Sequence, residues 1–80
     1  MKIITYTIGC YDSAPNGYYW SVPLRASKVW LQRTLGKRRD LLGTKLSRRQ
    51  FEVLRRRAPK YVELAWHARF AYYLEAVVSD

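Results

Sequence analysis

The chain has 80 residues, of which 49% are hydrophobic and 15% aromatic, and its formal net charge is +9 at pH 7. This length allows one domain with a small core, and the aromatic content excludes a disordered tail. The single cysteine, Cys10, excludes an internal disulfide. No apolar run approaches the roughly 18 residues of a membrane span, and the N-terminus is too polar for a signal peptide. We therefore expect a cytoplasmic protein of one basic domain, residues 1–80.

The positive charge is concentrated in one stretch of the chain. Residues 25–60, here called the basic block, contain thirteen of the fifteen Lys and Arg residues and two acids, which gives +11. The other residues include two bases and four acids, which gives −2. Concentrated positive charge costs self-repulsion and commonly marks a polyanionic partner.

Residues 1–23 have the pattern of an antiparallel β-hairpin. Residues 3–10 alternate between two faces and are rich in residues that favour strands. The sequence Pro15-Asn16-Gly17 indicates a turn, since Asn and Gly tolerate positive φ. A second strand is predicted over 18–22, and it ends at Pro23, which has no N–H to donate to a strand ladder.

Residues 24–58 are predicted to be a basic helical segment. Leucines spaced by seven and four residues indicate a first helix, and Gly36 stands where a C-terminal cap belongs. Residues 37–43 are predicted to be a connector that its two leucines anchor to the core. A second helix begins at Ser47, which forms a capping box with Gln50. Pro59 ends that helix, because the residue before a proline avoids the α region.

Residues 59–78 are predicted to form one long final helix with two apolar stripes. A helix that is apolar on two sides is buried on two sides, so one stripe could contact a partner or a second copy of the chain. A strand over 60–66 is the alternative to the first turns of this helix. The expected fold class is α+β, with the hairpin, and optionally a third strand, packed against two or three helices. The candidate protein interface is Val62, Trp66, Phe70, Tyr73 and Val77.

The arginines of the second helix are the main candidates for anion binding. Arg48 and Arg49 occupy its first two positions, where the helix dipole disfavours a cation by roughly 0.3–1 kcal/mol. A bound anion would reverse that penalty. On a helical wheel Arg55 lies on the side of Arg48, and Arg56 on the side of Arg49, which predicts two rows that follow phosphates. Arg57 fits neither row.

Two observations moderate this interpretation. Cations stabilise the C-terminal end of a helix, and Glu52 stands four residues before Arg56, which is a favourable spacing for an ion pair. The connector adds a separate basic cluster, and one lysine precedes the second helix. The residues predicted to bind nucleic acid or an acidic partner are Lys37, Arg38, Arg39, Lys45, Arg48, Arg49, Arg55 and Arg56.

The sequence contains no pattern of catalytic residues. His67 is the only histidine, and Glu63 could meet it on a helix, but a metal site needs more ligands than these two. Cys10 lies on an apolar strand, as a small buried hydrophobe would. A glycine-rich phosphate loop is absent. We expect no enzyme, no cofactor, no metal and no small-molecule substrate.

Residues 46–55 resemble the opening helix of helix-turn-helix transcription regulators and of the promoter-reading region of sigma factors. In those families a Leu-Ser or Leu-Thr cap leads into a Glu-Val-Leu-Arg stretch. They continue into a recognition helix with exposed polar residues, whereas residues 61–78 are apolar on two sides. The resemblance therefore ends after ten residues, and it implies no family and no residue role.

Two functions of different class follow. The first is a non-enzymatic nucleic-acid-binding module that contacts phosphates through the Arg-rich central segment, with DNA and RNA both open. The second is a small inhibitor or adaptor of the kind found in phages and mobile elements. It would bind a larger protein or nucleoprotein machine, such as a host defence complex, through its basic face. Either could be a homodimer.

Overall fold

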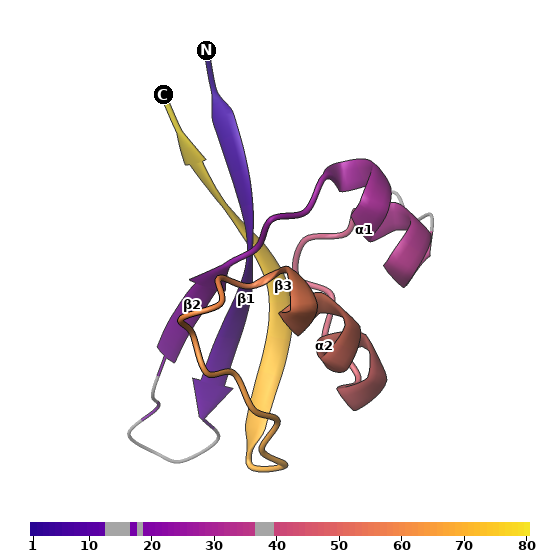
Figure 1. Ribbon diagram of the computed structural model, residues 1–80, viewed down its shortest axis with the longest axis vertical. Coiled ribbons are helices and arrows are strands. Elements are labelled where there is room, and N and C mark those ends of the chain that lie inside the picture. Colours follow the sequence, from indigo (N-terminus) through magenta and orange to yellow (C-terminus); the bar gives the residue numbers. More distant parts are fainter. Residues whose placement is uncertain (13–16, 18, 37–39) are drawn as a thin grey trace.

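The computed structural model describes residues 1–12, 17, 19–36 and 40–80. One antiparallel sheet has the strand order β2-β1-β3 and is formed by β1 (Ile3–Asp12), β2 (Tyr19–Pro23) and β3 (Phe70–Ser79). Between β2 and β3 the chain forms α1 (Lys28–Leu35), α2 (Arg48–Leu54) and a short 3-10 helix, η1 (Arg55–Arg57). The two chain ends lie side by side, away from the helices (Figure 1). No helix among the described residues is long and apolar enough to cross a lipid bilayer.

The predicted N-terminal hairpin is confirmed. Strand β1 pairs antiparallel with β2, so that Ile8 lies opposite Val22 and Cys10 opposite Trp20. Both pairs face the core, as the alternation of apolar side chains predicts. Pro15, Asn16 and Tyr18 lie outside the described residues.

The predicted final helix is wrong. Residues 70–79 form β3, which pairs with β1 from Ile3 opposite Ser79 to Asp12 opposite Phe70. The physical reason lies in β1, whose ten residues meet β2 only over Thr7–Tyr11 and leave the other edge of the strand to be paired. Residues 60–66, the alternative strand, form neither strand nor helix. The fold is mostly sheet with short helices.

Alternation along β3 divides the predicted interface stripe between different surfaces. Tyr72 and Leu74 face the helices and are fully buried, whereas Tyr73 points to the opposite face of the sheet. Phe70, Val62 and Trp66 are partly buried against the core. Val77 is exposed near the end of β3. Helical spacing predicts the stripe, whereas its residues lie in the loop before β3 and on both faces of β3.

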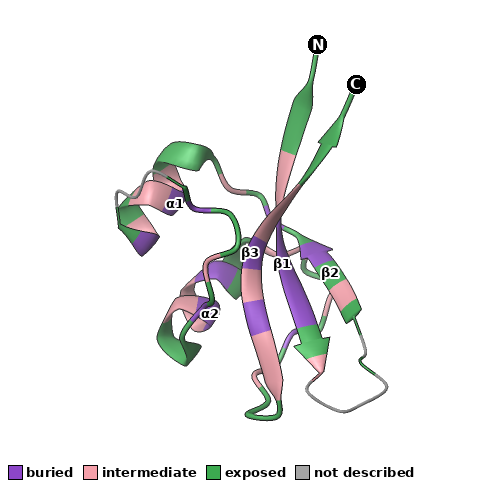
Figure 2. Cartoon of the chain, turned by 180° about the vertical axis from the view of Figure 1, so that it is seen from behind, coloured by how far each residue is buried: buried purple, intermediate pink, exposed green. Residues whose placement is uncertain are grey.

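The core fills the space between one face of the sheet and the two helices, with the loop after η1 closing one side (Figure 2). Tyr72 is at its centre, because the Phe51 ring lies 4.4 Å away edge-on and the Trp66 ring lies 4.7 Å away and stacked. The Tyr72 hydroxyl donates to the Ala65 carbonyl at 3.2 Å and accepts from the His67 backbone N–H at 3.0 Å. The buried hydroxyl therefore holds the loop before β3 in place.

Local signals around the helices are confirmed. The Ser47 side chain accepts from the Gln50 N–H at 3.2 Å, and the Gln50 side chain accepts from the Ser47 N–H at 2.9 Å. Gly36 caps α1 with φ 97°. Of the two connector leucines, Leu41 is buried, whereas Leu42 is exposed and anchors nothing.

Replacing Ser47 with Ala is expected to lower the free energy of unfolding by about 1 kcal/mol, because the Gln50 N–H loses its acceptor. Urea denaturation followed by tryptophan fluorescence measures this change. Ser21→Ala is the matched control, since Ser21 is exposed on β2 and caps no helix. An equal loss in both variants would contradict the assigned cap.

Candidate nucleic-acid interface

The first two residues of α2, Arg48 and Arg49, are exposed. Neither arginine takes part in an ion pair with another described residue. The two salt bridges among the described residues are formed by Arg55 and Arg69. The capping box fixes the backbone on which both arginines stand. Their guanidinium groups are therefore accessible to an anion from solution.

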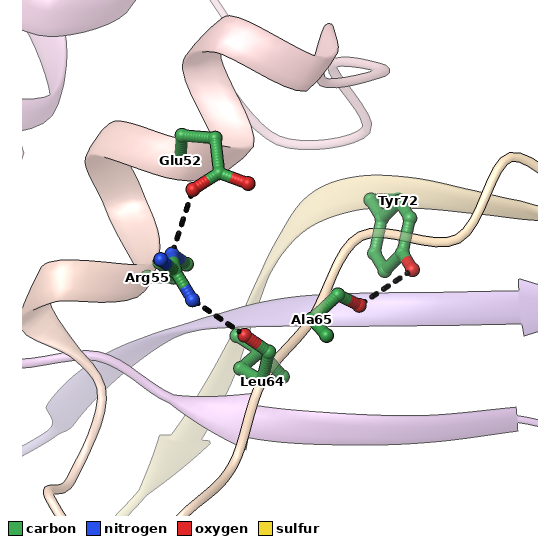
Figure 3. Close-up of polar contacts among 5 residues, drawn as sticks. All are labelled: Glu52, Arg55, Leu64, Ala65 and Tyr72. Atoms are coloured by element: carbon green, nitrogen blue, oxygen red, sulfur yellow. Dashed lines mark hydrogen bonds and ion pairs between the residues drawn. The ribbon is translucent and has the colours of Figure 1, made fainter.

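Arg55 has a different environment (Figure 3). Its Nε lies 2.8 Å from Glu52 Oε2, and one of its terminal nitrogens donates to the Leu64 carbonyl at 2.9 Å. The sequence spacing favoured Arg56 as the partner of Glu52, but the ion pair joins Glu52 to Arg55. Arg55 thus ties the end of α2 to the loop that follows η1.

Arg57 is also held by two contacts. Its guanidinium lies 4.5 Å from the centre of the Trp30 ring on α1, which is a cation–π distance. Its carbonyl accepts from the Arg25 backbone N–H at 2.8 Å. The second contact joins the segment after β2 to η1, so it brings the two ends of the basic block together.

Four basic residues line one hollow of about 530 Å³, here called the basic hollow. No carboxylate lines it, and none of its four cations forms an ion pair within the described part of the chain. Like charges in such an arrangement repel, and an anion that entered would relieve the repulsion. The lining residues are Arg25, Arg56, Arg57, Ala58, Pro59, Lys60 and Tyr61.

Sequence reasoning missed most of this site. Of its cations only Arg56 was a predicted binding residue, and Arg57 was set aside because it fits neither helical row. Arg25 and Lys60 stand at opposite ends of the basic block, and no spacing rule links them. The available clue was Pro59, which follows η1 and begins a turn that contains Lys60 and Tyr61 and is closed by the Val62 N–H donating to the Pro59 carbonyl.

Among the described residues, the other predicted cations do not line the hollow. Lys45 forms an isolated backbone bridge with Tyr73, which places its side chain on the sheet face that Tyr73 shares. Lys37, Arg38 and Arg39 lie outside the described residues. Among the described residues, α2 and η1 together carry four of the predicted cations.

Groups suited to catalysis stand apart from one another. Cys10 is buried, and this burial, with a smaller contribution from the charge of Asp12, raises the pKa of its thiol to about 11. His67 lies in the turn before β3 and shares no helix with Glu63. The described residues contain no group of three His, Cys, Asp or Glu side chains placed to hold a metal ion.

No protein-family model, curated protein or solved structure matches the chain.

Proposed function

We propose that the protein is a non-enzymatic nucleic-acid-binding module that contacts phosphates with the basic hollow and with the exposed arginines of α2. The observation that carries this proposal is that Arg25, Arg56, Arg57 and Lys60 line one hollow, with no carboxylate among the described lining residues. Folding does not require four cations there, and their repulsion opposes it. Phosphate oxygens would offset that repulsion and accept from the guanidinium groups.

The basic surface extends from the hollow along the second helix. Arg56 also lines an adjoining pocket with Arg55 and Leu64, and Arg48 and Arg49 stand at the opposite end of α2. A helix of seven residues is about 10 Å long. A nucleic-acid strand covers that distance in about three nucleotides at roughly 3.4 Å each. One strand could therefore reach both basic clusters.

Tyr61 favours a single strand as the ligand. It lines the basic hollow, and 86% of its surface is exposed, which is unusual for a large aromatic side chain. Proteins that bind single strands combine a positive groove with exposed rings on which bases stack. An unpaired base could lie on Tyr61 while its phosphate enters the hollow.

The test is a titration of random-sequence duplex and single-stranded DNA and RNA across a range of salt concentrations. Counterion release predicts that log K falls linearly with log[salt], with a slope of about −0.7 to −0.9 for each phosphate contacted. We expect single strands to bind more tightly than duplexes. Absence of binding at about 50 mM salt would overturn the proposal, because phosphate contacts are strong at low ionic strength. The function as an inhibitor or adaptor would then be the favoured proposal.

A double variant tests the hollow itself. Arg25→Gln with Lys60→Gln is expected to weaken single-strand binding and to reduce the salt slope by about 1.4 if each cation contacts one phosphate. Lys2→Gln with Lys28→Gln is the matched control, since it removes the same charge from residues outside the hollow. Equal weakening in both variants would mean that net charge alone attracts the ligand.

A further inference from the structure

The sheet face turned away from the helices carries a carboxylate surrounded by tyrosines. The Tyr11 hydroxyl donates to Glu75 Oε2 at 2.6 Å, and the Tyr19 hydroxyl donates to Glu75 Oε1 at 3.3 Å. The Tyr11 ring lies 4.8 Å from the Tyr19 ring and 5.4 Å, edge-on, from the Tyr73 ring. All three strands thus contribute to one cluster, here called the Glu75 cluster. Both helices pack on the other face (Figure 2).

Gly9 makes room for this arrangement. The Glu75 carboxylate lies directly over Gly9 on the central strand, and a Cβ at that position would overlap Glu75 Oε1. A residue with a side chain at position 9 would push the carboxylate away from both tyrosine hydroxyls. Gly9 therefore leaves the space that this position of the Glu75 carboxylate needs.

The cluster is suited to a cation. Among the described residues, Glu75 is the one charged residue that lines a shallow hollow of about 440 Å³, which it forms with Tyr11, Gly43 and Tyr73. A carboxylate has about four acceptor positions, and the two tyrosine hydroxyls occupy two of them. The hydrogen bond to Glu75 raises the pKa of Tyr11, and burial raises it further by a smaller amount. The Tyr11 hydroxyl therefore stays protonated and remains a donor. Tyrosine ring faces attract cations as well.

We propose that the Glu75 cluster is the docking site for an arginine side chain of a partner protein. A planar guanidinium can stack on a tyrosine ring while its N–H groups reach the free acceptor positions of the carboxylate. A lysine ammonium is more strongly hydrated and cannot stack in this way. Tyrosine and arginine are also enriched where binding energy concentrates in protein interfaces. The site goes beyond nucleic-acid binding, since none of its residues lines the basic hollow.

The direct test uses Nα-acetyl-arginine amide as the probe and records the backbone amide shifts of the ¹⁵N-labelled protein. We expect shifts confined to Gly9, Tyr11, Tyr73, Glu75 and their neighbours. The citrulline analogue has the same shape without the charge, and its affinity should be lower by a factor of about ten or more. The lysine analogue should also bind more weakly. Equal shifts with all three probes, or shifts scattered over the surface, would overturn the proposal.

Glu75→Gln is expected to weaken arginine binding about tenfold, because the charge is lost. The amide oxygen remains an acceptor for one tyrosine hydroxyl, whereas the hydroxyl that faces the amide NH2 loses its acceptor. Glu63→Gln is the control, because it changes the net charge equally at an exposed residue outside the cluster. Gly9→Ala supplies a second variant, which displaces the carboxylate without removing a functional group. Unchanged arginine binding in folded Glu75→Gln protein would refute the site, whatever the outcome for nucleic acid.

Discussion

Replacing Arg48 and Arg49 together by Glu is expected to make the protein more stable and its binding to nucleic acid much weaker. The acids would stand at the N-terminal end of α2, where negative charge is favoured by roughly 0.3–1 kcal/mol for each residue. Affinity should fall by roughly 25- to 60-fold near 0.1 M salt if two phosphate contacts are lost. Urea denaturation and fluorescence anisotropy measure the two changes on the same protein.

The matched control for this variant is Lys2→Glu with Arg33→Glu. It makes the same change in net charge, but Arg33 lies in the last turn of α1, where loss of a cation destabilises the helix. The control should therefore lower stability and weaken binding only through the long-range field. If the Arg48 and Arg49 variant keeps its affinity while the variant of the basic hollow loses it, the phosphate contacts are confined to the hollow.

Phe51→Ala is expected to cost about 3–5 kcal/mol of stability. Phe51 is fully buried, and its ring contacts the rings of Tyr72 and Trp66 at the centre of the core. A small domain has a total stability of only about 5–15 kcal/mol, so the loss would leave a substantial unfolded fraction at 37 °C. The midpoint of thermal unfolding, followed by circular dichroism, measures the effect.

Val29→Ala serves as the comparison for Phe51→Ala. Val29 lies on the exposed side of α1 with 57% of its surface accessible, so its truncation should change stability by less than about 0.5 kcal/mol. A loss below about 1 kcal/mol in Phe51→Ala would mean that the ring cluster around Tyr72 contributes little to the fold.

The sequence predicted those parts of the fold that depend on neighbours along the chain. The Ser47 capping box, the Gly36 cap and the first hairpin each follow from residues that are near one another in the sequence, and the most distant pair, Thr7 and Pro23 in the hairpin, is 16 positions apart. The strand in the C-terminal segment was not predicted, because Val62, Trp66 and Phe70 repeat at helical spacing. On β3 the decisive pattern is the alternation of the buried Tyr72 and Leu74 with less buried neighbours, and the strand that β3 pairs with is at the other end of the chain.

The candidate site also has one part that could be predicted from the sequence and one part that could not. The exposed pair Arg48 and Arg49 could be placed from helix rules alone. The basic hollow could not, because it depends on the hydrogen bond between the Arg25 N–H and the Arg57 carbonyl. Arg55 was assigned to the phosphate rows, but the contacts with Glu52 and Leu64 give it a structural role that only tertiary geometry reveals.

The pairing of the first strand with the last has a kinetic consequence. Strand β1 is the central strand, yet its longer partner, β3, is the last element of the chain. Before the sheet can close, a folding chain must bring together residues as distant as Ile8 and Leu74, which costs loop entropy and slows folding. During synthesis, β1 would wait with one edge unpaired until β3 leaves the ribosome. Aggregation at that edge would then be governed by the rate of translation, not by the stability of the finished fold.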